Sequence, residues 1–467
     1  MINTARLSFQ LLIVSALIIP FTFAARAQDN SLQTADDSDG KTPVPLEKKA
    51  EPSEAPEQQN WAIHVDAIEV FQGQPGFHAP YSGTNSLYPD ETFDQTGEAD
   101  LFIDFRLWPG AEFYFNPEYY QGFGLGITHG LVDFPNSMAY KVGKYRGDVN
   151  IPHLFIRQII GFGGEQEQLD ADELQLAEKV DTSRLTIQVG RMAVTDIFDN
   201  NAYAHNPRGD FLNWGAVDGI AFDYPADALG YEEGATIELN QKGWALRYAW
   251  FTIPERGNQN ATNGRYLEGW DQVIELEERY NLFGHPGKLR LLGYLERANM
   301  GSYRATTDEP SLQADIIATR RYRLTEGFEI NFEQEITSDL GAFLRLSARN
   351  PNYEAWQFTD ASRGLEVGLS LKGTAWRRPD DTVGIAEMAT GIGRAEQAWF
   401  NAGGLGILAG DGKLPNYGLE NVIEFYYNFE VYKGINFTFD YQFVANPAFN
   451  EDRGPVNIIG GRIDVKF

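Results

Sequence analysis

Apolar and polar residues alternate along many segments of residues 61–467, and this alternation is the clearest pattern in the chain. In the last segment, Ile459 and Ile463 fall on one face, whereas Arg462 and Asp464 fall on the other. Successive side chains of a β-strand point to opposite faces, so the pattern predicts strands with one apolar and one polar face. Comparable segments span 98–108, 111–118, 364–373 and 434–443.

The predicted strands are about ten residues long, which is the length that a tilted strand needs to cross a bilayer. Lipid cannot satisfy exposed backbone groups, so such a sheet has to close on itself. The pattern therefore predicts a transmembrane antiparallel β-barrel of 16, alternatively 18, strands with inward-folded loops. A soluble β-sandwich would alternate in the same way, but its strands would be nearer five or six residues long.

The strand number stays open because the positions of two tight turns do not agree with the number of strands predicted between them. The turns near 109–110 and 241–243 should both be periplasmic, which requires an even number of strands between them, and the pattern gives five. One predicted strand is therefore wrong. Longer connections, some of which we expect to fold inward, span 119–149, 192–214, 252–270, 298–311 and 392–417. The acidic stretch 165–180 is predicted to form a short, solvated helix.

The amino-terminal part predicts export from the cytoplasm. Residues 1–27 combine a basic start, an apolar stretch and the small-residue pattern before Gln28, as a cleavable signal peptide does. Residues 28–60 are acidic, contain prolines and almost no large apolar side chains, and predict a disordered leader. No other long apolar run occurs, so we expect the membrane to be crossed by the barrel of residues 61–467.

Composition narrows the class of protein further. The net charge of −28 argues against nucleic acid as a partner. The chain contains no cysteine, so disulfides, thiol chemistry and cysteine-bound metals are excluded. Aromatic residues make up 13% of the chain, which fits two aromatic girdles at the membrane interfaces. We expect neither a metal nor another cofactor.

Several longer stretches resemble the carbohydrate-selective porin family of the OprB type. The signature region is SRLTIQVGRMAVTDIFDNNAYAHNPRGDFLNWG at 183–215. Further matches occur in the same order at 153–168, 238–254, 408–429 and 439–458. The resemblance covers residues 61–467 and implies a barrel in the bacterial outer membrane that passes glucose-like sugars by diffusion. The leader is not part of the resemblance.

The inward-facing side chains are of the kinds that a sugar path requires. A sugar exchanges its hydrogen bonds with water for bonds to charged and amide groups, and its ring faces stack on aromatics. The residues that we expect to contact sugar are Asp104, Arg106, Glu112, Tyr114, Glu118, Phe155, Arg157, Arg247, Glu333 and Arg345. Arg157 is the leading candidate, although an inward arginine can also pair with a glutamate to hold the barrel wall.

Five polar residues of the signature region could be mistaken for a metal or catalytic cluster: Asp196, Asp199, Asn200, His205 and Arg208. We expect them instead to hold a loop through side-chain to backbone hydrogen bonds. Trp214 is expected either at the aromatic girdle or at the mouth of the barrel.

Three other functions remain open from the sequence. A general diffusion porin without sugar preference would have the same alternation. An outer-membrane enzyme would need a nucleophile and a base, yet none of the six histidines lies in a GxSxG or HExxH motif. A soluble sugar-binding sandwich would extract without detergent. The expected partners are a mono- or oligosaccharide and outer-membrane lipid, with the protein as a monomer or a homotrimer.

Overall fold

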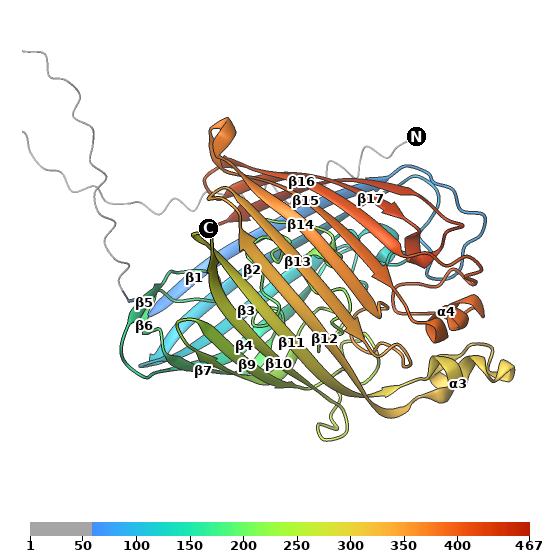
Figure 1. The fold of residues 1–467 in the computed structure, drawn as a ribbon, viewed down its shortest axis with the longest axis horizontal. Coiled ribbons are helices and arrows are strands. Elements are labelled where there is room, and N and C mark those ends of the chain that lie inside the picture. The colour runs from blue at the N-terminus through green and yellow to red at the C-terminus, as the bar shows by residue number, and fades with distance from the viewer. Residues whose placement is uncertain (1–57) are drawn as a thin grey trace, which may run out of the picture. The chain divides into compact units, whose positions relative to one another are not determined.

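Sixteen antiparallel strands close into a barrel in which the first strand pairs with the last (Figure 1). The computed structural model describes residues 58–467. The barrel strands are β1 (Trp61–Gln74), β2 (Thr92–Trp108), β3 (Ala111–Gln121), β4 (Asp148–Gly161), β7 (Arg184–Met192), β8 (Glu232–Asn240), β9 (Trp244–Phe251), β10 (Trp270–Leu282), β11 (His285–Met300), β12 (Arg321–Glu335), β13 (Leu340–Arg349), β14 (Arg363–Gly373), β15 (Arg378–Gly391), β16 (Glu420–Tyr432), β17 (Ile435–Ala445) and β18 (Val456–Lys466).

The prediction of a 16-stranded barrel is confirmed, and the alternative of 18 strands is wrong. Four strands, β3, β4, β7 and β8, lie between the turns at 109–110 and 241–243, so the count of five strands was wrong. An even number of strands places both turns at the same end of the barrel.

The predicted division into an outer apolar face and an inner polar face is also confirmed. On β2, Leu101 and Phe105 are 36% and 46% exposed, whereas the intervening Asp104 is fully buried. On β14, Val367 is exposed while its neighbour Glu366 is buried. The apolar side chains thus form the surface that faces lipid, and the charged ones point into the barrel.

The two ends of the barrel differ in their connections. The short turns span 109–110, 241–243, 283–284, 336–339, 374–377 and 433–434. The opposite end carries longer loops, which span 75–91, 122–147, 193–231, 252–269, 301–320, 350–362, 392–419 and 446–455 and include α3 (Tyr303–Thr307) and α4 (Arg394–Asn401). Barrels of this class have short periplasmic turns and long extracellular loops, so the end with the short turns is the periplasmic end.

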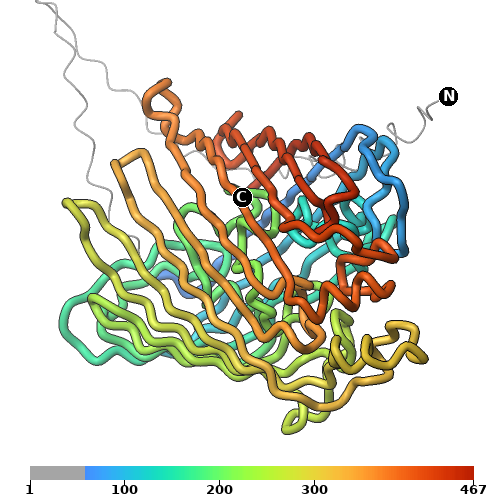
Figure 2. The backbone as a smooth tube through the Cα atoms, turned by 45° about the vertical axis from the view of Figure 1, so that its right-hand side comes forward, coloured from blue at the N-terminus to red at the C-terminus, as the bar shows by residue number. Residues whose placement is uncertain are grey.

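The loop between β7 and β8, residues 193–231, folds into the barrel rather than away from it (Figure 2). It contains α2 (Trp214–Val217), whose four residues are all buried. It fits closely against the wall at Gly219, where a Cβ atom would lie 1.7 Å from Oε2 of Glu329 and would force that side chain to shift. The expectation of an inward-folded loop is confirmed by these contacts.

The connection between β4 and β7 differs from the prediction. Residues 165–180 contain no helix, and they form the hairpin of β5 (Gln166–Leu169) and β6 (Glu178–Asp181). Residues 165–166 and 170–172 of this connection are exposed as expected, whereas Leu176 and Ala177 are buried, so only part of it is a solvated surface. No helix within residues 58–467 is long and apolar enough to cross a bilayer. The predicted signal peptide at 1–27 and all but the last three residues of the leader at 28–60 lie outside the described residues.

Candidate functional site

A cavity of about 510 Å³ lies inside the barrel, beside strands β2, β3 and β4. Its wall includes Asp100, Phe155 and Arg157, all from inward positions of these strands. The β7–β8 loop supplies Trp214 and Tyr231 from the facing side. The cavity is therefore enclosed between barrel strands and a loop that folds back onto them.

Arg157 is held in this wall by several contacts. Its guanidinium lies over the ring of Tyr114, with Cζ 4.6 Å from the ring centroid, and its Nη1 donates to the Tyr114 hydroxyl at 2.8 Å. Nη1 also lies 3.8 Å from Glu112 on the neighbouring strand. The side chain keeps 14% exposure, so Arg157 both pairs within the wall and faces the cavity.

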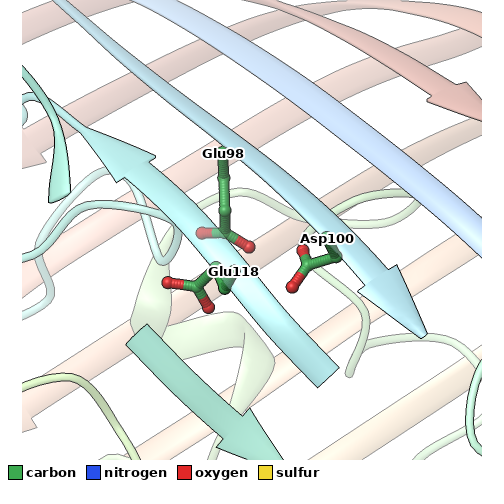
Figure 3. Close-up of side chains that lie close together, drawn as sticks. All are labelled: Glu98, Asp100 and Glu118. Atoms are coloured by element: carbon green, nitrogen blue, oxygen red, sulfur yellow. The ribbon is translucent and has the colours of Figure 1, made fainter. Parts of the chain in front are cut away.

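Three carboxylates from two adjacent strands meet at another part of the wall (Figure 3). Glu98 and Asp100 of β2 and Glu118 of β3 each place an oxygen within 4.8 Å of the others. The guanidinium of Arg208, from the β7–β8 loop, pairs with Glu98 and lies 2.5 Å from Asp100. It also lies 3.2 Å from Asp66 on β1. The cluster is thus an ion-pair network that fastens the loop to the wall.

Aromatic rings surround the loop side of the cavity. Trp214 stacks on Phe134 with their centroids 5.4 Å apart and their planes 9° apart, and Phe358 packs 5.5 Å from Trp214. Trp214 is 2% exposed and lies in the barrel interior. The prediction that it belongs to the girdle or the mouth is therefore wrong.

One histidine connects the loop to the cavity wall, and a second lies within the loop. His153 on β4 lies 2.9 Å from Asn116 through Nδ1 and 2.8 Å from Asp196 through Nε2. His205 lies 4.0 Å from Asp218. Burial, together with the charge of Asp199, raises the pKa of the Asp218 carboxyl to about 7. Burial lowers the pKa of His205, so at neutral pH this imidazole is uncharged.

Only some of the residues predicted from the sequence to contact sugar reach the cavity. Phe155 and Arg157 line it. A second group lies directly behind the lining in the same part of the wall: Asp104, Arg106, Glu112, Tyr114 and Glu118, all buried except the half-buried Arg106. These residues hold Arg157 and the acidic cluster in place, for example through the 2.6 Å bond from Tyr114 to Glu112.

The other three predicted residues lie on β9, β12 and β13, outside the part of the wall that lines the cavity. Arg345 is fully buried, and it contacts Asp199 at 2.9 Å and the carbonyl oxygen of Ala204 at 2.7 Å. The predicted residues Arg247 and Glu333 are likewise engaged in buried ion pairs, with Glu275 and Arg290 respectively. None of the three lines the cavity.

The expectation that Asp199 holds a loop is confirmed. Its carboxylate accepts a hydrogen bond from the backbone N–H of Gly219 at 2.8 Å, and its own N–H donates to Glu275 at 2.8 Å. Arg208 has a different task, because its guanidinium bonds carboxylates of the wall and not backbone groups.

Several lining residues were not predicted from the sequence. They come from connections whose path the alternation does not specify: Phe134, Lys141, Asp172, Glu173, Leu174, Gln175, Tyr231 and Phe358. Lys141 donates to the carbonyl oxygen of Ile407 at 2.9 Å and so joins two loops. The sequence indicates their role only through composition, since these connections are rich in glycine, aromatic and acidic residues.

Comparison with known families agrees with this geometry. The family model "Carbohydrate-selective porin, OprB family" matches residues 84–467. The chain belongs to the OprB family of carbohydrate-selective porins. It is therefore an outer-membrane porin, a channel and not an enzyme, through which sugars diffuse across the outer membrane.

A solved structure of an OprB porin shares this fold. The high-pH structure of Pseudomonas putida OprB superposes with a TM-score of 0.66 at 16% identity, covering 87% of this chain and 94% of that chain. The low-pH structure of the same protein gives a TM-score of 0.47 at 13% identity, covering 87% and 93%. The search of curated proteins gave no match.

Proposed function

We propose that this OprB-family porin passes glucose-like sugars by passive diffusion along the cavity beside β2–β4, and that Arg157 and Phe155 contact the sugar. The observation that carries the proposal is the hydrogen bonding of the Arg157 guanidinium. Nη1 and Nε are bonded within the protein, whereas Nη2 has no hydrogen-bond partner among residues 58–467. A guanidinium fixed on one edge and open on the other can donate to sugar hydroxyls without rearranging.

The surroundings of Arg157 suit a sugar that must also leave. Carboxylates and amides of the lining can accept hydrogen bonds from hydroxyls, and the ring of Phe155 offers an apolar contact to a sugar face. Diffusion requires weak contacts at several sites and not one tight pocket. The network around Arg157 provides such contacts, whereas the fully paired Arg345 does not.

The test is single-channel conductance in planar bilayers, with glucose added. We expect open channels whose ion current falls as glucose is added, and liposomes that swell in glucose. Channels whose current ignores every sugar tested would indicate a general diffusion porin and contradict the proposal. Chemical cross-linking in detergent distinguishes a monomer from a homotrimer, and in both assemblies each barrel has its own cavity.

A further inference from the structure

The connection between β4 and β7 enters the barrel from the periplasmic end. Its base is exposed, as shown by the pair of Glu165 and Lys242, whose side chains are 62% and 77% exposed. Its tip, residues 170–177, turns inward in its second half: residues 170–172 are exposed, whereas Leu176 is fully buried and Leu174 packs against the apolar cluster that contains Tyr114. We call residues 170–177 the strap tip.

Contacts from different elements fix the strap tip. Next to β1, the Gln59 N–H donates to the Ala177 carbonyl at 2.9 Å, and the Ala177 N–H donates to Oε1 of Gln59 at 2.8 Å. At the end of β18, Lys466 pairs with Glu173 at 2.8 Å. The adjoining Glu178 is paired with Arg106 of β2 at 2.8 Å. These anchors hold the tip at one position against the neighbouring strands β18, β1 and β2.

The strap tip also reaches the proposed sugar contact. Nη1 of Arg157 donates to the carbonyl oxygen of Leu174 at 3.0 Å and to Oε1 of Gln175 at 3.3 Å. All four residues from 172 to 175 line the cavity. The edge of Arg157 that is bonded within the protein therefore faces the strap tip. The tip therefore forms part of the cavity wall toward the periplasmic end.

We propose that the strap tip is the specificity-determining element that limits the size of the sugar that can leave toward the periplasm. This inference rests on the proposed function, since it concerns the same cavity. A solute that passes Arg157 must next pass through the gap that the strap tip leaves open on the periplasmic side. Because the tip is anchored to several strands, the gap has a fixed width, and pore width sets which solutes diffuse.

The register of the hairpin allows a direct test. Leu169 pairs with Glu178, so replacing residues 170–177 with Asn-Gly closes β5 and β6 as a two-residue hairpin and removes the tip. We expect ion conductance to rise at least about twofold, and the rate of liposome swelling in disaccharide relative to glucose to rise by a similar factor. The matched control is Glu165→Gln, which breaks the exposed ion pair at the base of the same connection and should change neither quantity.

The outcomes separate the two proposals. If the unaltered porin passes glucose and the shortened variant keeps both conductance and sugar ratio, the strap inference is overturned. If the unaltered porin passes no sugar, the proposed function fails. The strap inference is then tested by ion conductance alone: a rise in the shortened variant supports it, and an unchanged conductance overturns it. If the shortened variant does not fold, the double variant Glu173→Gln, Gln175→Ala decides. It removes two side-chain contacts of the tip, and it should raise the disaccharide ratio; an unchanged ratio would contradict the inference.

Discussion

Arg157 and Arg345 lie at equivalent inward positions on opposite sides of one barrel, yet they have different environments. Arg157 on β4 keeps 14% exposure and faces the cavity. Arg345 on β13 is fully buried and contacts Asp199, Glu329 and Glu366 within 4 Å. An inward position on a barrel strand therefore does not by itself make a residue part of the solute path. The β7–β8 loop determines which inward residues border the solute path, because it fills the side of Arg345 and leaves the side of Arg157 open.

The largest effect should come from removing Arg345. The Arg345→Ala variant leaves the buried carboxylates of Asp199 and Glu366 without their cation, and breaking a buried ion-pair network costs about 3–5 kcal/mol. We expect the unfolding temperature in detergent, measured by circular dichroism, to fall. We also expect larger fluctuations of the single-channel current, because the loop is held less tightly. Arg363→Ala, at an exposed position of β14, is the control. An unchanged unfolding temperature would show that this side of the barrel does not depend on the network.

Arg208 links the two sides of the barrel. It belongs to the β7–β8 loop, which fills the side of Arg345, and it pairs with carboxylates on the strands of the cavity side. We expect Arg208→Gln to destabilise the protein by about 2 kcal/mol, because hydrogen bonds between charged groups are lost. Its carboxylate partners would no longer be neutralised, so the ratio of cation to anion permeability should rise. Reversal potentials in a salt gradient measure this ratio. An unchanged ratio would place these carboxylates away from the ion path.

On the open side, Arg157→Ala should weaken glucose binding while leaving the barrel folded. Loss of a charged hydrogen-bond donor to a ligand costs about 1.4 kcal/mol, which is about a tenfold weaker block of ion current by glucose. The exposed Arg304→Ala, on α3, is the control. If the block is as strong in the Arg157 variant as in the unaltered porin, sugar is bound elsewhere.

The smallest effect concerns pH. The pKa of Asp218, which lines the cavity, is raised to about 7, so its carboxylate is charged above pH 7 and neutral below it. Cation selectivity should therefore fall as the pH is lowered from about 8 to about 6. In Asp218→Asn this step should disappear. A step of the same size in that variant would assign the titration to another group.

The barrel was predictable from the sequence because alternation is a local property. The outward positions of Leu101 and Val367 follow from a period of two residues, whatever the rest of the chain does. The cavity was only partly predictable, because its lining depends on where long connections run. Nothing local indicates that Trp214 stacks on Phe134, or that residues 172–175 turn into the barrel. Such contacts join segments far apart in the chain.

The central claim is that the solute path follows the β2–β4 side and that the loop closes the far side. Because the chain has no cysteine, a single introduced cysteine is the only thiol that a reagent can modify, and two serine-to-cysteine substitutions therefore test this claim. Ser137 lines the cavity, whereas Ser347 on β13 is buried beneath the loop, where it accepts from the N–H of Ala221. We expect a charged methanethiosulfonate reagent to reduce the single-channel current of Ser137→Cys, with protection by glucose, and to leave Ser347→Cys unmodified. Rapid modification of Ser347→Cys with loss of current, and an unaffected Ser137→Cys channel, would contradict the account.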